Sequence, residues 1–267
     1  MTTPAGSQVL HTAVSGAGPR VVLAHGFTQD GTVWGGLDDA LAVDHEVVAA
    51  DLPGHGGSAD IRADVPSGAA LLGAAGGPGD YLGYSMGACH CLQLALDRPD
   101  LVGRLVLISG TAGIEDVGER AARRTADEAL ASRLDPADGS PPVDTVATFV
   151  EAWVRLPLFG AIPDAALGME ARRRGSAPGL AASLRLAGTG SQGPLWDRLG
   201  TLSVPVLLVA GAEDARYVDL AHRMARSIGL RAEVHLVAGA AHAPHLQAPG
   251  EVAGVVRSFL DGGRRID

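Results

Sequence analysis

The sequence contains no lysine, only two cysteines and few aromatic residues. All 21 of its basic residues are arginines, and 30 acidic residues bring the formal net charge to −9. This balance argues against nucleic acid or an anionic membrane surface as a partner, because both attract a positively charged face. Cys89 and Cys91 lie too close together in the chain for a structural disulfide, so the cysteines give no sign of an oxidising compartment.

Long apolar segments are also missing. Residues 1–20 lack the basic start and apolar run of a secretory signal, and no stretch reaches the roughly 18 apolar residues of a membrane span. We therefore expect a cytoplasmic globular protein, a monomer or a homodimer, that acts on a small molecule and has no membrane or nucleic-acid partner. Because aromatic residues make up 4% and all hydrophobic residues 46%, the core must consist mainly of Ala, Val and Leu.

The chain contains short, continuous apolar runs, each followed by turn residues and a helix-compatible stretch. Continuous runs are typical of strands that are buried on both faces, as in a parallel sheet covered by helices. An edge strand is also predicted at residues 7–14. The pattern indicates an α/β fold with a mostly parallel sheet flanked by helices, in which functional side chains follow the carboxyl ends of the strands. The six runs are residues 20–26, 45–54, 79–85, 103–110, 204–211 and 231–239.

The strand-like runs stop between about residues 112 and 199. Helix-compatible segments alternate there with breaks rich in Pro and Gly at residues 135–142 and 177–179. Helices inserted between two strands of a parallel sheet lie over the carboxyl ends of the strands, where a lid would sit. We therefore predict a core of residues 1–111 and 200–267 and a helical cap of residues 112–199.

Residues 83–87, Gly-Tyr-Ser-Met-Gly, fit the pattern G-x-S-x-G at a junction between a strand-like and a helix-like stretch. The two glycines allow a tight turn that lifts the Ser85 hydroxyl clear of the sheet. The start of the following helix then offers backbone N–H groups to a developing oxyanion. The sequence therefore predicts Ser85 as a nucleophile.

A serine nucleophile needs a base, and the base needs an acid that orients it. In this architecture the acid and the base follow the serine in the chain, and Asp214 and His242 each come shortly after a strand-like run. Both are expected at the same edge of the sheet as Ser85. Their neighbours Glu213 and His245 remain alternatives for the acid and the base.

A second motif, His25-Gly26-Phe27, follows the predicted strand at residues 20–26. Gly26 permits a sharp turn, so the N–H of Phe27 can point at the oxyanion beside the N–H of Met86. We predict that these two N–H groups form an oxyanion hole, and we interpret His25 as a hydrogen-bonded loop histidine.

The order Cys-His-Cys at residues 89–91 raises the alternative of a metal or redox cluster. On a helix, Cys89 and Cys91 are two positions apart and so face different ways, and no second set of ligands follows at a spacing typical of zinc sites. The sequence predicts no metal and no cofactor, with Cys91 as a small core residue.

In order and over nearly the whole chain, the motifs resemble those of the α/β-hydrolase family. The resemblance implies a triad of Ser85, Asp214 and His242, an oxyanion hole formed by Phe27 and Met86, and a helical cap. The matching segments are HGFTQDGTVW (25–34), DLPGHGGS (51–58), GYSMG (83–87), GAED (211–214) and GAAHAPH (239–245).

The cap carries a finer resemblance. The segments WVRLPLF (153–159) and SLRLAGTGSQGPLW (183–196) resemble the menaquinone-pathway synthases that form 2-succinyl-6-hydroxy-2,4-cyclohexadiene-1-carboxylate by eliminating pyruvate. Enzymes of that subfamily hold a substrate with several carboxylates by means of arginines and a cap tryptophan. The resemblance implies substrate-binding roles for four residues: Tyr84, Arg120, Trp153 and Arg172.

The chain departs from that subfamily at one position. Those synthases continue the serine motif as G-Y-S-M-G-G-R, whereas this chain reads G-Y-S-M-G-A-C, so Cys89 stands in place of an arginine. Losing an arginine beside a retained carboxylate would weaken binding by roughly a few kcal/mol. Either the substrate differs, or another group compensates.

The sequence thus predicts an enzyme with a Ser-His-Asp triad that acts on a small, carboxylated substrate. Ester hydrolysis and pyruvate elimination would use the same residues and stay open. An alternative is a C–C bond hydrolase of ring-fission products, which shares the triad and the helical cap. The alternative outside the enzymes is a non-catalytic, ligand-binding member of the fold.

Overall fold

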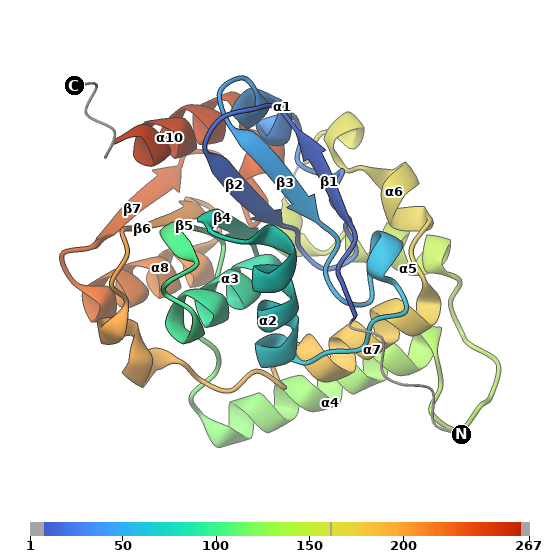
Figure 1. The fold of residues 1–267 in the computed structure, drawn as a ribbon. Coiled ribbons are helices and arrows are strands. Elements are labelled where there is room, and N and C mark those ends of the chain that lie inside the picture. Colours follow the sequence, from blue (N-terminus) through green and yellow to red (C-terminus); the bar gives the residue numbers. More distant parts are fainter. Residues whose placement is uncertain (1–7, 161, 263–267) are drawn as a thin grey trace, which may run out of the picture.

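The computed structural model of the chain describes residues 8–160 and 162–262. They form a seven-stranded sheet with the order β1-β3-β2-β4-β5-β6-β7, which lies between two layers of helices (Figure 1). Strand β1 (Thr12–Ser15) pairs antiparallel with β3, and the other neighbouring strands pair in parallel. The predicted α/β fold with a mostly parallel sheet is therefore confirmed.

Each of the six predicted apolar runs coincides with one parallel strand, although β5 begins at Val102, one residue before the run predicted at 103–110. The observed strands are shorter than the runs because the flanking turn residues belong to loops. The edge strand predicted at residues 7–14 is observed at Thr12–Ser15, and residue 7 lies outside the described residues. The parallel strands are β2 (Arg20–Ala24), β3 (Glu46–Ala50), β4 (Gly79–Tyr84), β5 (Val102–Ile108), β6 (Val206–Gly211) and β7 (Ala232–Val237).

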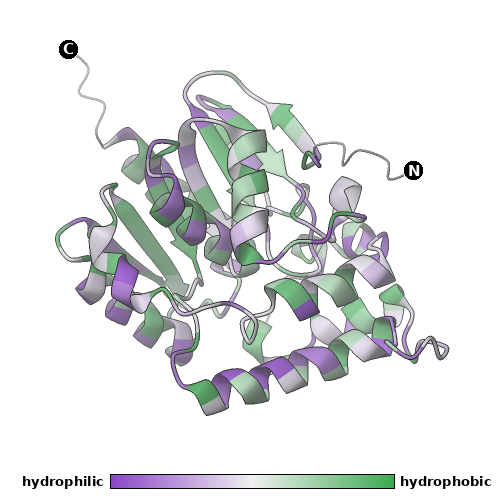
Figure 2. Cartoon of the chain, turned by 60° about the horizontal axis from the view of Figure 1, so that its bottom comes forward, coloured by the Kyte–Doolittle hydropathy of each residue, from purple (hydrophilic) through white to green (hydrophobic). Residues whose placement is uncertain are grey.

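Side chains that alternate along a strand serve two separate cores. In β2, Val22 packs into the first core and Val21 into the second, since successive side chains point to opposite faces. Hydrophobic residues dominate the strands in Figure 2, whereas the helices combine hydrophobic and hydrophilic residues. The first core lies under α2 (Val65–Gly76), α3 (Met86–Asp97) and α8 (Ala215–Ile228), and the second under α1 (Leu37–Ala42), α9 (Pro244–Gln247) and α10 (Pro249–Asp261).

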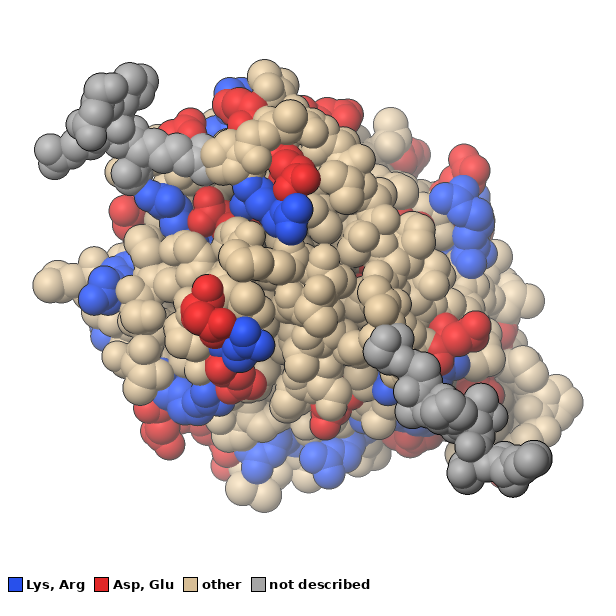
Figure 3. All heavy atoms as spheres, in the orientation of Figure 1, with Lys and Arg blue, Asp and Glu red and all other residues tan. Residues whose placement is uncertain are grey.

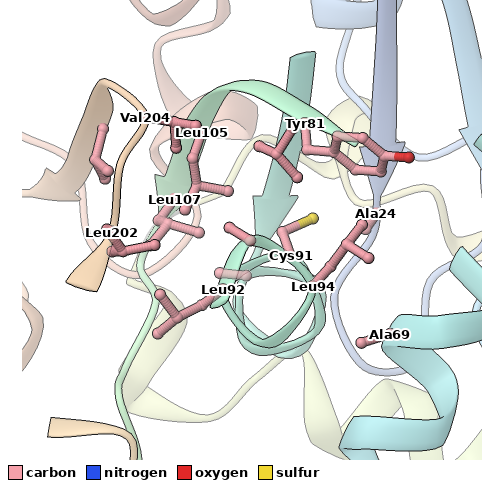
Figure 4. Close-up of a cluster of buried hydrophobic side chains, with 14 of the residues drawn as sticks. Ala24, Ala69, Tyr81, Cys91, Leu92, Leu94, Leu105, Leu107, Leu202 and Val204 are labelled. Carbon is pink, nitrogen blue, oxygen red and sulfur yellow. The ribbon is translucent and has the colours of Figure 1, made fainter. Parts of the chain in front are cut away.

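Helix α3 shows why the Cys-His-Cys order is not one cluster. Cys91 is fully buried in the first core, where Figure 4 shows it with Leu94, Leu105 and Leu107 around it. Cys89 belongs instead to a small separate cluster with Val65 and Ala187. The two thiols therefore lie in different surroundings, as expected for positions two apart on a helix.

The described part of the segment between β5 and β6 consists of helices joined by loops, with no strand. Its helices α4, α5 and α7 share a core of their own, which includes Leu134, Phe149 and Leu184, and partly buried Phe27 packs against this core (Figure 1). The elements of this cap are α4 (Val117–Leu134), α5 (Val146–Trp153), η2 (Pro157–Phe159), η3 (Asp164–Ala166), α6 (Met169–Arg173), α7 (Ala177–Ala187) and η4 (Trp196–Thr201).

The two ends of the cap are tied to each other. The Leu195 N–H donates to the Ala112 carbonyl over 2.7 Å, and the indole N–H of Trp196 donates to the Gly113 carbonyl over 2.9 Å. Because both connections leave the core at one place, the cap lies as a unit over the carboxyl ends of the strands.

Charged side chains of both signs are interspersed on the face of the molecule in Figure 3. Many arginines pair with an acid, as in Arg98–Asp100 at 2.7 Å and Arg198–Asp97 at 2.8 Å. None of the helices in the described residues is long and apolar enough to cross a membrane.

Candidate active site

Ser85 occupies the sharp turn between β4 and α3. Its backbone angles are φ 51° and ψ −109°. Residues other than glycine rarely adopt this conformation, so the surrounding structure must hold the turn in place. The Ser85 N–H donates to the Ile108 carbonyl of β5 over 2.9 Å. A Cβ added to Gly83 would lie 2.4 Å from the Gly87 carbonyl oxygen, so the close approach of these two residues requires glycine.

Three side chains from three strand ends form a hydrogen-bonded chain. Ser85 Oγ lies 3.0 Å from His242 Nε2, and His242 Nδ1 lies 2.9 Å from Asp214 Oδ2. With the imidazole proton on Nδ1, His242 donates to Asp214 and accepts the hydroxyl proton of Ser85. His242 and Asp214 are both buried, at 2% and 8% exposure, so little water competes for these bonds.

Asp214 has a second role in the local structure. It is the N-cap of α8, and its Oδ1 accepts the Tyr217 N–H over 3.3 Å. One carboxylate oxygen is therefore fixed by the helix while the other faces His242. This arrangement sets the orientation of the imidazole.

The structure shows which of the neighbouring acids and histidines is bonded to the others: Asp214 and His242 take part in the chain of hydrogen bonds, and Glu213 and His245 do not. Glu213 is exposed, and its backbone N–H donates to the Ala240 carbonyl. His245 is fully buried against the Tyr84 ring, with centroids 4.3 Å apart, and within the described residues neither of its ring nitrogens has a partner. Burial lowers the pKa of His245 to about 3, with the Arg172 charge contributing. Neither alternative residue joins the chain of bonds from Ser85.

Aromatic rings surround His242. The Tyr217 ring lies edge-on with its centroid 4.3 Å from that of His242, and the rings of Tyr84 and Phe159 follow at 5.7 and 5.9 Å. The cap also reaches His242 directly, because the His242 N–H donates to the Leu158 carbonyl over 3.2 Å. Sequence reasoning missed Tyr217, whose position three residues after the helix cap Asp214 is the one signal that could have pointed to it.

A cavity of about 90 Å³ opens beside Ser85 and His242, and we call it the Ser85 cavity. This volume corresponds to roughly three water molecules at the density of the liquid. Among the described residues that line it there is no carboxylate. Besides Ser85 and His242, they are Phe27, Tyr84, Met86, Cys89, Thr111, Arg123, Trp153, Leu158, Phe159, Arg172, Ser183, Leu184, Ala187, Gly188, Thr189 and Tyr217.

Phe27 and Met86, the residues expected to supply the oxyanion hole, both line the Ser85 cavity. Met86 is the first residue of α3, where backbone N–H groups have no acceptor within the helix. Phe27 lies in the loop after β2, and the ring of Trp153 from the cap packs against its side chain with centroids 5.0 Å apart. The side chain of Met86 is held as well, since Ser183 Oγ donates to its sulfur over 3.3 Å.

Arg172 of α6 is a buried guanidinium in the wall of the Ser85 cavity. It is 2% exposed, and it donates through Nε to the Leu167 carbonyl over 2.7 Å and through Nη1 to Thr28 Oγ1. Within the described residues no carboxylate makes an ion pair with it. Burial lowers its pKa to about 10, although the nearby Tyr84 hydroxyl and Asp30 favour the charged form. Arg172 is therefore a positive charge without a counter-ion.

The second arginine expected from the sequence lies elsewhere. Arg120 does not line the Ser85 cavity and donates through Nη1 to the carbonyls of Ile114 and Glu115, over 2.7 and 3.1 Å. Arg123, one turn further along α4, lines the cavity instead. Nothing in the sequence distinguishes the two, because only the packing of α4 on α7 decides which arginines of this helix face inward.

The other predicted substrate contacts, Tyr84 and Trp153, both line the Ser85 cavity. Burial raises the pKa of the Tyr84 hydroxyl above its ordinary value, so it stays protonated and can donate a hydrogen bond. Cys89 lines the cavity too, and its thiol lies 3.8 Å from the Thr111 carbonyl. Burial raises the Cys89 pKa to about 11, which keeps the thiol neutral.

The Ser85 cavity thus contains a serine hydroxyl in hydrogen-bond contact with a histidine, and a buried guanidinium in its wall. Among residues 8–160 and 162–262, no three His, Cys, Asp or Glu side chains come together in a group that could hold a metal ion.

The chain is similar to known proteins over most of its length. A protein of Bacillus subtilis, provisionally named 2-succinyl-6-hydroxy-2,4-cyclohexadiene-1-carboxylate synthase, is 31% identical over 93% of this chain and 94% of its own. The pimeloyl-[acyl-carrier protein] methyl ester esterase of Vibrio atlanticus is 29% identical over 90% of this chain and 93% of its own.

Among solved structures, MenH from S. aureus superposes with a TM-score of 0.84 at 27% identity, covering 96% of this chain and 99% of that one. The alpha/beta hydrolase family matches residues 21–255, from the first buried strand to the last helix. The chain belongs to the α/β-hydrolase family.

Proposed function

We propose that the chain is an enzyme that uses Ser85, His242 and Asp214 as a catalytic triad on a small substrate with a carboxylate. The single observation that carries the substrate class is Arg172. A buried guanidinium with no counter-ion, in the wall of the same cavity as Ser85, is arranged to receive an anion. Tyr84, whose neutral hydroxyl lies near the Arg172 charge, would donate to the same carboxylate.

The reaction that this geometry supports best is ester hydrolysis. Ser85 Oγ attacks the carbonyl carbon while His242 Nε2 takes the hydroxyl proton, and the imidazolium then gives that proton to the leaving alcohol. The acyl group stays on Ser85 until a water molecule, deprotonated by the same nitrogen, attacks it and releases the acid. Asp214 stabilises the imidazolium in both halves of the reaction.

The N–H groups of Phe27 and Met86 would bind the oxyanion of each tetrahedral intermediate. Met86 begins α3, and Phe27 lies in the loop directly after β2, where Trp153 of the cap packs against its ring, so both N–H groups would be oriented before the reaction begins. Removal of one oxyanion donor costs about 3 kcal/mol in enzymes of this kind.

The test uses 4-nitrophenyl acetate and the Ser85→Ala variant. The native chain should release a burst of nitrophenolate equal to the enzyme concentration, followed by slower steady turnover, because the acyl-enzyme accumulates. Ser85→Ala should lose the burst and at least about a thousandfold of the turnover while it keeps the melting temperature of the native chain. Turnover that survives in a folded Ser85→Ala variant would exclude this mechanism.

A second candidate is pyruvate elimination, which the similarity to the Bacillus subtilis protein and to MenH favours. His242, held by Ser85 and Asp214, would abstract a proton from the substrate and the C–O bond to pyruvate would break, with no acyl-enzyme. Supplying the synthase substrate and measuring pyruvate by coupled reduction separates the two candidates. Pyruvate release without an ester burst would favour elimination, and an ester burst without pyruvate would favour hydrolysis.

A further inference from the structure

The two arginines in the wall of the Ser85 cavity differ in their partners. Arg123 donates through Nε to Asp127 Oδ1 over 2.8 Å, one turn along α4, whereas Arg172 has only neutral partners. Asp127 is 1% exposed, and its second oxygen has no hydrogen-bond partner within the described residues. Arg123 is therefore the counter-ion of a buried carboxylate, and Arg172 is not paired.

The Arg123–Asp127 pair must stay together. Taking its counter-ion away from a buried carboxylate is strongly unfavourable, so Arg123 is not free to offer its full charge to a ligand. Asp127 is fixed in place as well, because a Cβ on Gly188 of the cavity wall would lie 2.6 Å from its Oδ2. Taken together, the two side chains carry no net charge.

The two arginines come from different helices, Arg172 from α6 and Arg123 from α4, and have different neighbours. Arg172 contacts Thr28 and the Leu167 carbonyl, and its charge lies near Tyr84. The Arg123 charge lies near Cys89 and Tyr217 instead. We call the part of the Ser85 cavity beside Arg172 and Tyr84 the Arg172 end, and the part beside Arg123, Cys89 and Tyr217 the Arg123 end.

The Arg123 end is neutral in its other groups too. Cys89 is a buried, protonated thiol, Thr111 and Tyr217 are uncharged, and Ala187 is apolar. Asp214 lies behind His242 and does not line the cavity, and Asp30 lies near Arg172 without an ion pair. Among the described residues that line the cavity, Arg172 is thus the arginine without an ion-pair partner.

We infer that the Ser85 cavity is selective for a substrate with a single carboxylate, which Arg172 and Tyr84 bind, and that the part of the substrate at the Arg123 end is uncharged. This inference rests on the proposed function, since it assumes that the cavity holds the substrate. A second carboxylate at the Arg123 end would meet a cation already neutralised by Asp127, and would lose its hydration without gaining an ion pair.

Three methyl esters test the inference because they differ only in carboxylates on one five-carbon chain. Methyl pentanoate has none, monomethyl glutarate has one, and the 1-methyl ester of propane-1,2,3-tricarboxylate has two. Their binding to the Ser85→Ala variant is measured by calorimetry, so the order of affinities is defined even if the native chain hydrolyses none of them. Hydrolysis by the native chain, followed as acid release, reports separately on the proposed function.

We expect monomethyl glutarate to bind about ten- to a hundredfold more tightly than methyl pentanoate, the range for a charge-assisted bond. The tricarboxylate monoester should bind no more tightly than monomethyl glutarate. If it binds threefold or more tightly, or if all three esters bind equally, the inference is wrong. If the affinities contradict the inference in one of these ways but the native chain still hydrolyses an ester in a reaction that requires Ser85, the proposed function is supported and only the inference is wrong.

The decisive variant is Asp127→Asn, made in the Ser85→Ala background. It frees the Arg123 charge, so the tricarboxylate monoester should gain at least about tenfold relative to monomethyl glutarate. Glu128→Gln is the matched control, because it removes one acid from the same helix and its partner Arg185 does not line the Ser85 cavity. In this variant the ratio of the two affinities should stay within twofold of the ratio in the Ser85→Ala parent. A folded Asp127→Asn variant without this gain would contradict the inference.

A second variant covers the case in which Asp127→Asn does not fold. Cys89→Arg places a new cation at the Arg123 end and leaves both residues of the Arg123–Asp127 pair in the sequence. It should likewise raise the affinity for the tricarboxylate monoester relative to monomethyl glutarate by about tenfold, and a ratio unchanged from the native cavity would count against a neutral Arg123 end.

Discussion

The α-carbon of Gly87 lies directly against the backbone of Ala24. A Cβ built on Gly87 would be 1.9 Å from the Ala24 carbonyl oxygen and 2.4 Å from its carbonyl carbon. This contact presses the first turn of α3 onto the end of β2, the strand that leads to Phe27. The second glycine of the serine motif thus sets the distance between the two elements that carry the proposed oxyanion donors.

Gly87→Ala should therefore destabilise the fold, because the clash is with backbone atoms that have no free space to move into. We expect a loss of at least about 3 kcal/mol in the free energy of unfolding, measured by urea denaturation. Gly254→Ala is the control. Gly254 lies within α10 and a Cβ there meets nothing within 4 Å, so that change should stabilise the chain by roughly 0.5–1 kcal/mol. Equal effects of both changes would contradict the packing argument.

Asp214→Asn should lower kcat for an ester substrate by about a thousandfold or more. An amide keeps the size and the helix cap of Asp214 but loses the charge that stabilises the His242 imidazolium and fixes its tautomer. The neighbouring change Glu213→Gln should leave kcat within about twofold, because Glu213 is exposed and takes no part in the chain of bonds from Ser85. Steady-state kinetics of both variants, with melting curves to show that they fold, decide between the two acids.

Arg172→Gln should lower kcat/KM for monomethyl glutarate by about ten- to a hundredfold, since it removes the charge that faces the carboxylate. Methyl pentanoate should lose far less, and its turnover shows that the variant is folded. Arg120→Gln should change kcat/KM for either ester by less than about twofold, because Arg120 bonds to carbonyls outside the Ser85 cavity. A larger loss in Arg120→Gln than in Arg172→Gln would reverse this assignment.

Buried histidines should make the fold sensitive to mild acid. Burial lowers the pKa of His25 to about 4 and that of His55 to about 3, and their rings lie 5.0 Å apart. Below an ordinary histidine pKa of about 6.5 the unfolded chain binds protons at both sites while the folded chain does not, so stability is full above that pH and falls as the pH drops towards 4.

Each of these two histidines should contribute about 2 kcal/mol of lost stability between pH 7.5 and pH 5. His55→Gln should therefore reduce the loss between those two pH values by about that amount, measured by urea denaturation. The same change at the exposed His222 should leave the pH dependence unaltered. A pH dependence that is equal in all three chains would show that the acid sensitivity has another origin.

The sequence by itself predicted the sheet, its mostly parallel order and the helical segment between β5 and β6. It could do so because these features depend on local patterns: apolar runs of strand length, turn residues after them, and an absence of such runs for almost ninety residues. The Gly-x-Ser-x-Gly motif belongs to the same class of signal. Its glycines are required by contacts within a few residues and by one close approach to a neighbouring strand.

The residues in the wall of the Ser85 cavity depended on the tertiary structure. Arg120 and Arg123 are one turn apart on one helix, and only the packing of α4 against α7 turns Arg123 towards the cavity. Tyr217 reaches His242 because Asp214 caps α8 and fixes its first turn. Neither the orientation of Arg123 towards the cavity nor the contact of Tyr217 with His242 follows from a recognised sequence motif.

The same division holds for charge. Composition determined that every cation of this protein is an arginine, and the motifs determined which residue is the proposed nucleophile. The Arg123–Asp127 pair has the i,i+4 spacing of a helix, but only the tertiary structure decided that Asp127 is buried and that Arg172 has no ion-pair partner among the described residues, because burial and ion pairing across the fold depend on packing.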